Sequence, residues 1–421
     1  MFRSSVYLFA LLASLLFAAC TQNSDSKTVE AGLGAAPAPA FAQLLDRNAA
    51  IRNGKEWDDV QNIYAAQIKA LSANPKDHEA RLKLSEVFIN EARITGEHPH
   101  YYPAALAAVE PVVTDLSGKT TLNPQEKDHL FRALSNKASV QLSLHDFSTA
   151  LETAQKAVAI NPYNAQIYGA LVDAHVELGN YAQAVEMADK MVSIRPDLRS
   201  YSRVSYLREI HGDVPGAIEA LDMAIKAGFP GQESTAWTRL TLGNLHKTYG
   251  DWKNAELQYL SILEERPDYP FALAALGEVE MHKKNYAKAE ELLKKACDII
   301  PEVGYYESLA EVYQATGRTA EFEALIPEIE KMMSEDTEKG HNMSLEYAAL
   351  YTDLKPDYAK ALQYAQGEYA KRPNNIDVNR LLARIYAAQQ NKAQAKEHFA
   401  KASATKSKHP ELMEIKKMLG S

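Results

Sequence analysis

Two histidines and a carboxylate stand close together between positions 93 and 102. Glu97, His98 and His100 are side chains of the types that bind Zn²⁺ and related ions. A His-x-His pair with one carboxylate offers two or three ligands, so one interpretation is a metal-binding or small-ligand site. The other is a long turn whose histidines and tyrosines cover an apolar end of the fold. Both interpretations stay open at this stage.

The tetrapeptide Ser117-Gly118-Lys119-Thr120 ends in the way that a phosphate-binding loop ends. Such a loop also needs a glycine five residues before Gly118, where this chain has Val113. The sequence contains no Gly-x-Ser-x-Gly and no Cys-x-x-Cys motif either. We therefore expect no nucleotide, no cofactor and no enzymatic activity. Cys297 lies among apolar residues and is expected to be a buried small side chain.

Cys20 is the residue with the clearest expected chemistry. Arg3 is followed by an apolar run over residues 6–17, which is too short to span a bilayer as a stable helix. The run ends in Phe17-Ala18-Ala19-Cys20. Small residues directly before a cysteine resemble the bacterial lipobox, in which the cysteine is acylated and becomes the new N-terminus. The alternative is an ordinary secretory signal that is cut after Ala19.

The lipobox resemblance implies a location as well as an anchor. A cysteine that carries two acyl chains or more, such as palmitate, is anchored firmly, because one chain alone binds a membrane only marginally. Thr21 follows the cysteine where an aspartate would favour retention at the inner membrane. By resemblance to that sorting rule we expect a lipid anchor in the outer membrane of a bacterial cell envelope. Residues 21–40 lack large apolar side chains and are expected to form a disordered tether.

The rest of the chain repeats itself with a period near 34 residues. Leu242-Gly243, Ala255 and Pro267 recur 34 residues later as Leu276-Gly277, Ala289 and Pro301. A small residue continues the series in both directions, at Ala150, Ala184, Ala217, Ala361 and Ala395. Such a period is typical of a helix-turn-helix unit that stacks on copies of itself. The small residues allow the two helices to cross closely, and proline ends the second helix.

These positions resemble the tetratricopeptide repeat, and some eight of them match in each copy. The chain is also similar to a group of bacterial repeat lipoproteins to which no activity is attached. The resemblance implies an all-α, right-handed superhelical solenoid of about ten hairpins. We expect degenerate hairpins over residues 41–125, with helical periodicity from about Phe41 and an inserted loop at 93–102. Regular repeats should follow over 126–405, and a C-terminal capping helix over 406–421.

In this repeat the first helix of each hairpin lines the inside of the superhelix, which implies a set of binding residues. They combine Arg, Tyr, Trp, Asn and Lys, types that are enriched at binding hot spots or suited to hold a peptide. The expected concave-face residues are Arg203, Tyr206, Trp237, Thr241, Asn244, Lys247, Glu278 and His282. For Trp237 the alternative role is packing against Phe229 in the preceding connection.

We expect Arg203 and Lys247 to hold an acidic group of a peptide that lies along the concave face. The net charge of −9 argues against a surface for nucleic acid or anionic lipid headgroups. The sequence therefore predicts a membrane-tethered scaffold that binds a protein or peptide partner. The alternative is an accessory protein that binds a metal or small ligand through His98 and His100.

Overall fold

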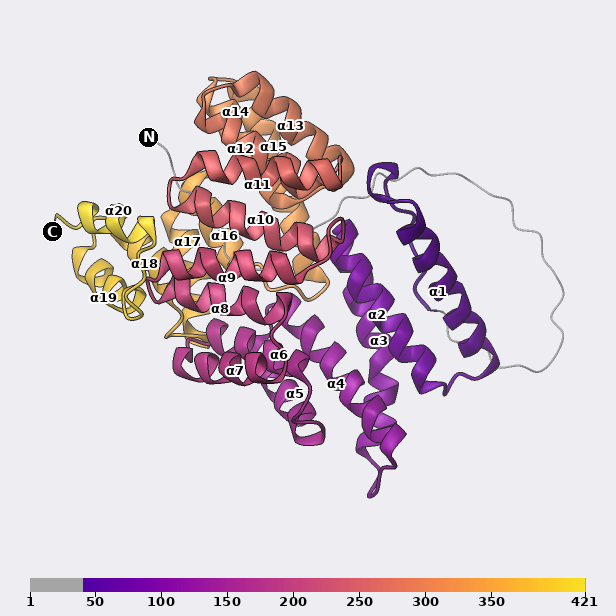
Figure 1. Cartoon of the computed structure of the whole chain (residues 1–421). Coiled ribbons are helices and arrows are strands. Elements are labelled where there is room, and N and C mark those ends of the chain that lie inside the picture. The colour runs from indigo at the N-terminus through magenta and orange to yellow at the C-terminus, as the bar shows by residue number, and fades with distance from the viewer. Residues whose placement is uncertain (1–40, 421) are drawn as a thin grey trace.

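A computed structural model describes residues 41–420, and all of the regular structure in that range is helical (Figure 1). It contains twenty α-helices and one short 3₁₀ helix, η1 (Ala49–Ile51), which confirms the all-α solenoid. The predicted signal segment 1–20, the tether 21–40 and Cys20 lie outside the described residues. Within 41–420, none of the helices is both long and apolar enough to cross a membrane.

The helices follow one another as antiparallel neighbours joined by short connections. In chain order they are α1 (Lys55–Ala73), α2 (His78–Thr95), α3 (His98–Ser117), α4 (Pro124–Ser143), α5 (Phe147–Ile160), α6 (Ala165–Glu177), α7 (Tyr181–Ile194), α8 (Leu198–Ile210), α9 (Val214–Ala227), α10 (Glu233–Thr248), α11 (Trp252–Glu265), α12 (Pro270–His282), α13 (Tyr286–Ile299), α14 (Val303–Ala315), α15 (Thr319–Glu338), α16 (Ser344–Asp353), α17 (Tyr358–Lys371), α18 (Ile376–Ala388), α19 (Lys392–Ala402) and α20 (Pro410–Met418). From α2 to α19 they form nine hairpins.

Small residues hold the two helices of a hairpin close together. Ala255 and Ala289 have no exposed surface. A Cβ atom built on Gly243 would lie 2.3 Å from the Tyr259 ring, and one on Gly277 would lie 2.8 Å from Leu293. Gly243 therefore makes room for the aromatic ring of Tyr259 on α11. Glycine is required there because any larger side chain would push α11 away from α10.

The predicted loop at 93–102 is wrong. Helix α2 continues through Thr95 and ends at Gly96, which has the left-handed φ of 76°. Helix α3 begins at His98, so the connection is only two residues long. Pro99 lies in the first turn of α3, where a backbone N–H has no helical partner to lose. The stretch therefore continues the helical hairpin.

The N-terminal unit also differs from the prediction, because it is not a hairpin. Residues 41–48 have no helical structure, and the first α-helix begins at Lys55. The segment is held by Arg47, whose side chain has no exposed surface and lies 2.6 Å from the equally buried Glu91 of α2. The Tyr101 hydroxyl accepts a hydrogen bond from the Leu45 N–H at 2.9 Å. The apolar residues at 41–45 thus pack beside α2 and α3 without forming a helix.

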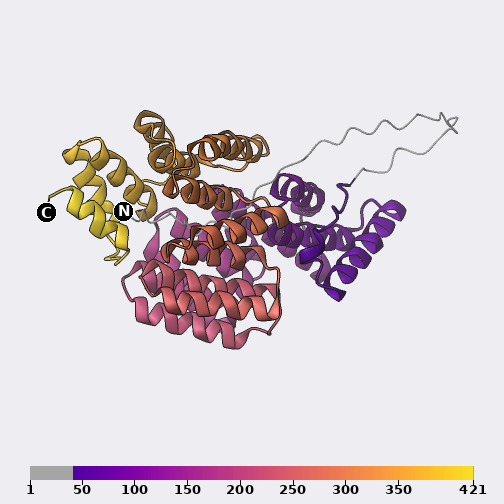
Figure 2. The same ribbon diagram turned by 90° about the horizontal axis from the view of Figure 1, so that it is seen from above.

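The superhelix closes on itself. The connection between α15 and α16 contacts the α4–α5 turn, where the Asn342 N–H donates to the Leu144 carbonyl oxygen at 3.1 Å. The Asn375 side chain, just before α18, donates to the Glu177 carbonyl oxygen at the end of α6. The approach at Gly179 is so close that a Cβ atom there would lie 2.5 Å from Asn374. The C-terminal hairpins therefore return beside the central ones, as Figure 2 shows.

The chain ends as predicted, with a helix that caps the last hairpin. Helix α20 packs through Ile415, which is fully buried in one cluster with Leu382 and Ala395 of the preceding hairpin. The buried Glu411 in its first turn contacts Arg380 of α18 at 2.7 Å. This helix covers the apolar end that a solenoid would otherwise expose.

Candidate functional site: a central cavity inside the superhelix

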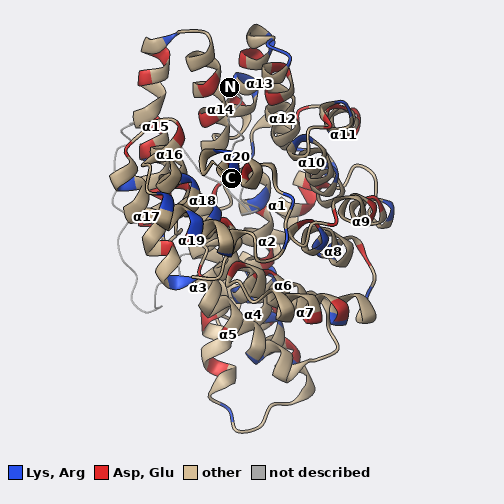
Figure 3. Cartoon of the chain, turned by 90° about the vertical axis from the view of Figure 1, so that its left-hand side faces the viewer, with Lys and Arg blue, Asp and Glu red and all other residues tan. Residues whose placement is uncertain are grey.

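Closure of the superhelix turns its concave face into a cavity of about 250 Å³, which we call the central cavity. Its walls come from the first helix of six successive hairpins, α8, α10, α12, α14, α16 and α18. The connection before α20 adds Ser407 and His409. Figure 3 shows α8, α10 and α12 on one side of the molecule and α16 and α18 on the other. The cavity is thus bounded on two sides, unlike the open concave face that was expected.

Three aromatic side chains line the central cavity at the same position of consecutive repeats. They are Trp237, Phe271 and Tyr305, and each lies 34 residues after the one before it. The Trp237 and Phe271 ring centroids are 5.2 Å apart, and those of Phe271 and Tyr305 are 6.0 Å apart, both edge to face. Phe229, the alternative partner of Trp237, is instead 77% exposed. Trp237 therefore belongs to an aromatic row that faces the cavity.

Six of the eight expected binding residues line the central cavity: Tyr206, Trp237, Thr241, Asn244, Lys247 and Glu278. The Asn244 side-chain oxygen accepts a hydrogen bond from the Tyr259 hydroxyl at 2.8 Å, which fixes the amide. Lys247 and Glu278 form an ion pair between α10 and α12. Burial lowers the pKa of Lys247 to about 7, although nearby Glu311 opposes that change.

Arg203 and His282 do not line the central cavity. The Arg203 guanidinium binds both carboxylate oxygens of Asp173, at 2.9 and 2.6 Å, between α8 and α6. The His282 ring stacks on Trp252 with centroids 4.0 Å apart and an interplanar angle of 8°. The expectation that Arg203 and Lys247 await an acidic ligand is wrong, because carboxylates of the chain itself already neutralise both cations.

Carboxylates dominate the part of the central cavity formed by α14 and α16. Burial is the main reason why the pKa of Glu307 rises to about 8, and the carboxylates of Glu311, Asp353 and Glu346 raise it further. Burial also raises the pKa of Glu346 to about 7. Burial also raises the pKa of Glu209, on α8, to about 7. This wall repels negative charge and is stabilised by positive charge.

Arginine 380 is the cation on the opposite wall, and it is paired. Its guanidinium contacts Asp377 at 2.6 Å and Glu411 at 2.7 Å. Arg384, one turn further along α18, contacts Asp353 at 2.9 Å. These pairs leave no cation of α18 directed at Glu307, since both guanidinium groups are bound to other carboxylates.

The two histidines of the predicted metal site point to different places. His98 is 2% exposed, and its ring lies 4.4 Å from that of Tyr102. The His100 ring nitrogen Nε2 instead donates to the Gln43 carbonyl oxygen at 2.8 Å. Residues two apart on a helix do not share a face. Burial lowers the pKa of His98 to about 3, and no group of three potential ligands within 41–420 is arranged to hold a metal ion.

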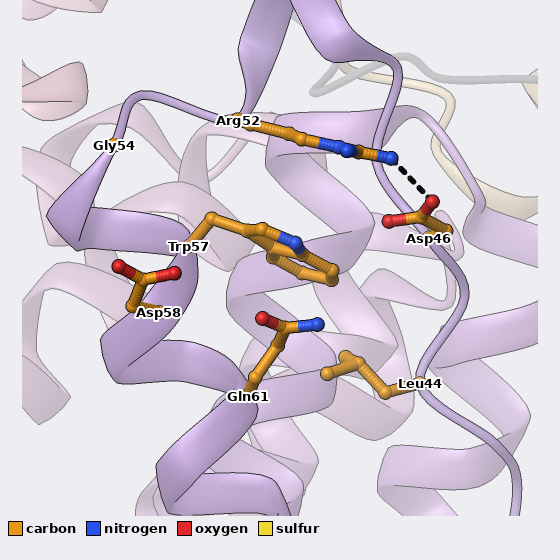
Figure 4. A pocket seen from close by; sticks show the side chains of 7 residues that line it. All are labelled: Leu44, Asp46, Arg52, Gly54, Trp57, Asp58 and Gln61. Carbon is orange, nitrogen blue, oxygen red and sulfur yellow. Dashed lines mark hydrogen bonds and ion pairs between the residues drawn. The ribbon is translucent and has the colours of Figure 1, made fainter.

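A second, larger pocket of about 580 Å³ lies at the N-terminal end of α1 (Figure 4). All of its walls come from residues 44–61, and none of the expected binding residues takes part. Trp57 forms its floor and is itself only 6% exposed. Arg52 pairs with Asp46 at the rim, and both are substantially exposed. This pocket is a local depression with one exposed ion pair.

Sequence reasoning missed Tyr305, Glu307 and Glu346 as members of one site. Tyr305 had a signal, because it lies one repeat after Phe271. Glu307 lies on α14, the first helix of its hairpin, which the repeat resemblance directs inward. Glu346 was missed although it lies on α16, the first helix of the hairpin that follows α14 and α15.

Comparison with known proteins agrees with this architecture. Residues 141–209 and 240–303 match family models described as tetratricopeptide repeats. Over 76 residues the chain is 33% identical to the SGT1 homologue of Oryza sativa subsp. japonica. These residues make up 18% of this chain and 20% of that protein. The chain thus spans about a fifth of the length of this curated relative.

Two solved structures illustrate the similarity in fold. One is a thermophilic tetratricopeptide-repeat protein of Thermus thermophilus, with 20% identity and a TM-score of 0.41, covering 48% of this chain and 99% of that one. The other is PilW, a type IV pilus biogenesis factor, with 15% identity and a TM-score of 0.40, covering 56% of this chain and 98% of that one. The repeat positions, the helical hairpins and the two family matches show that this chain contains tetratricopeptide repeats.

Proposed function

We propose that this protein is a non-enzymatic scaffold that binds a segment of a protein partner in the central cavity. Tetratricopeptide solenoids present concave surfaces to partners. The observation that carries the proposal is the row of Trp237, Phe271 and Tyr305, which lines the cavity at one repeat position on three neighbouring helices. Aromatic side chains grouped on a rigid concave wall are the usual anchors of an interface.

The size of the cavity limits what enters it. A volume of about 250 Å³ is smaller than the ~300–1,000 Å³ typical of sites for drug-sized ligands. It accommodates one or two side chains of a partner and no folded domain. The partner's remaining contacts would lie outside the cavity, around its opening.

Capture of the partner after crosslinking in intact cells tests this function. Trp237→Ala should weaken capture by roughly 2 kcal/mol or more, because it removes a central aromatic anchor. Phe229→Ala is the matched control, since that ring is 77% exposed and lies outside the cavity. Equal capture by both variants, with helical content unchanged, would move the binding site away from the cavity.

We further propose that Cys20 carries lipid and tethers the scaffold to a bacterial envelope membrane, the outer membrane by the rule applied to Thr21. The supporting observation is the apolar run that ends in Ala18-Ala19-Cys20. Cys20→Ser should release the protein into the soluble fraction, because two acyl chains or more are needed for firm anchoring. Wild-type protein that is already soluble would overturn the anchor without affecting the cavity.

A further inference from the structure

Two carboxylates on one wall of the central cavity, Glu307 and Glu346, have no contacting cation among the described residues. Glu307 lies beside Glu311, Asp353 and Glu346. No hydrogen bond or ion pair reaches the Glu307 carboxylate from any residue of the described part of the chain. Both oxygens of Glu346 are buried, and no other residue among 41–420 donates a hydrogen bond to them. Burying such groups without a partner is unfavourable, so a structural role does not explain them.

A second feature of the same wall is the hydroxyl of Tyr305. The side chain is 8% exposed and lines the central cavity two residues before Glu307. Its oxygen is buried and has no hydrogen-bond partner in the described residues. A buried phenol nearly always finds a partner. Here, as for Glu346, the free polar atom lies on the wall of the cavity, which points to a group that arrives from outside.

The cations near this wall are bound to carboxylates other than Glu307 and Glu346. Arg372 lowers the pKa of Glu346, but its guanidinium is bound to Glu177 and Glu368. Lys247 is paired with Glu278, Arg380 with Asp377 and Glu411, and Arg384 with Asp353 and Glu411. His409 also lines the cavity, but burial lowers its pKa to about 2, so its ring stays neutral. A ligand cation would therefore meet two carboxylates, Glu307 and Glu346, that no cation of the described residues contacts.

We propose that the central cavity recognises a lysine or arginine side chain of the partner protein, with its cationic end at Glu307 and Glu346 and its alkyl part against Trp237 and Phe271. This assignment rests on the proposed function and names the chemistry of the segment bound there. Charge complementarity supports it, as does the aromatic row, because ring faces attract cations and cover alkyl chains. The Tyr305 oxygen would accept one further hydrogen bond from the ammonium or guanidinium group.

Binding of defined peptides to the purified full chain tests this assignment. The probes are acetylated and amidated pentapeptides Gly-Leu-X-Leu-Gly, in which X is lysine, arginine, glutamine or glutamate, with titration calorimetry as the readout. We expect the lysine and arginine peptides to bind at least tenfold more tightly than the glutamine peptide. The glutamate peptide should bind most weakly. Free spermidine should bind more weakly than the lysine peptide, since it lacks the leucines that would contact the rim.

A double variant separates the site from the general charge of the protein. Glu307→Gln with Glu346→Gln should lower the affinity for the lysine peptide at least tenfold and leave that for the glutamine peptide unchanged. Glu264→Gln with Glu328→Gln removes the same charge from exposed positions and should leave both affinities unchanged.

The affinity for the lysine peptide should also rise by up to tenfold per pH unit between pH 6 and 8, because ionisation of Glu307 favours the cation.

The outcomes distinguish the two proposals. Equal binding of all four peptides, sensitive to Trp237→Ala, would overturn the preference for a cation and leave the scaffold function in place. If spermidine binds as tightly as the lysine peptide, the ligand is a free polyamine and not a partner side chain, which would overturn this assignment. Absence of binding by every peptide would contradict both this assignment and the use of the cavity.

Discussion

Two regions of the molecule bury charge in opposite ways. At the N-terminal end, the Arg47 guanidinium lies between Glu91 and Glu56, at 2.6 and 2.8 Å, and also donates to the Ile51 carbonyl oxygen. In the central cavity, Glu307 and Glu346 are buried beside other carboxylates, and no cation contacts Glu307 within the described residues. The first arrangement is complete within the chain, whereas the second lacks a positive partner.

The difference shows where the fold uses charge for stability and where it keeps charge for binding. A buried ion pair holds its geometry because removing either partner leaves an uncompensated charge. A buried group of like charges destabilises the free protein, and this unfavourable term disappears when an opposite charge binds. The N-terminal cluster fastens residues 41–51 to α2, and the cavity wall is ready for a ligand cation.

The largest expected effect comes from breaking the complete cluster. Arg47→Ala leaves Glu91 buried without a cation and should reduce the free energy of unfolding by about 3–5 kcal/mol. Arg52→Ala is the control, since its ion pair with Asp46 is exposed and worth about 0–1 kcal/mol. Urea unfolding of the two variants measures the difference. Similar small losses in both would show that the N-terminal cluster is not the stabilising one.

The next effect concerns packing rather than charge. Ala289 has no exposed surface, and its carbonyl oxygen lies 3.4 Å from a Cβ atom built on Gly277, where α12 and α13 cross. Ala289→Leu should cost about 1–3 kcal/mol by overpacking this crossing. Because a repeat contacts mainly its neighbours, faster hydrogen exchange should be confined to α10–α15. Uniform loosening from α2 to α19 would contradict this local coupling.

Removing a charge from the cavity wall should raise the stability of the protein, whereas Arg47→Ala lowers it. At pH 9 the wild-type Glu307 is ionised beside other carboxylates, since its pKa is raised to about 8. Glu307→Gln should therefore raise the urea midpoint at pH 9. It should change the midpoint much less at pH 6, where the wild-type carboxyl is already neutral. A variant that is less stable than wild type at pH 9 would mean that Glu307 has a stabilising partner.

The last prediction concerns the pH dependence of the wild-type protein, in which contributions of opposite sign partly cancel. Glu307 and Glu346 have pKa values raised from 4.5 to about 8 and 7, so the unfolded chain releases their protons first. They make stability fall as the pH rises from about 5 to 8. The pKa values of His98 and His145 are lowered from 6.5 to about 3 and 4. These two histidines therefore make stability fall as the pH drops below 6.5. Thermal unfolding should show the highest midpoint where the two ranges overlap, at about pH 5 to 6.5, and a midpoint that rises steadily to pH 9 would be contrary to this account.

The sequence predicts the structure within a repeat much better than the contacts between distant repeats. Within a repeat, the 34-residue period indicates the helices, the buried Ala255 and Ala289 and the inward position of Trp237, because neighbouring repeats pack through local rules. Between distant repeats there is no such rule. The approach of Asn375 to Glu177 depends on small rotations added over several hairpins, and it has no signature in the sequence.

The same limit explains the two errors at the N-terminus. The stretch predicted as a loop is helical, because proline is accepted near the start of a helix and Gly96 ends the preceding one. Residues 41–48 have apolar spacing that suits a helix. Their structure is instead set by Arg47, whose partner Glu91 lies 44 residues away.

The central claim is that the carboxylate wall of the cavity holds a cation from a partner. Its most direct test is a crystal structure of the full chain with the acetylated lysine pentapeptide. We predict density for the peptide in the central cavity, with the lysine Nζ about 3 Å from a carboxylate oxygen of Glu307 or Glu346. A peptide bound outside the cavity, or bound inside it with the lysine directed away from both carboxylates, would contradict the account.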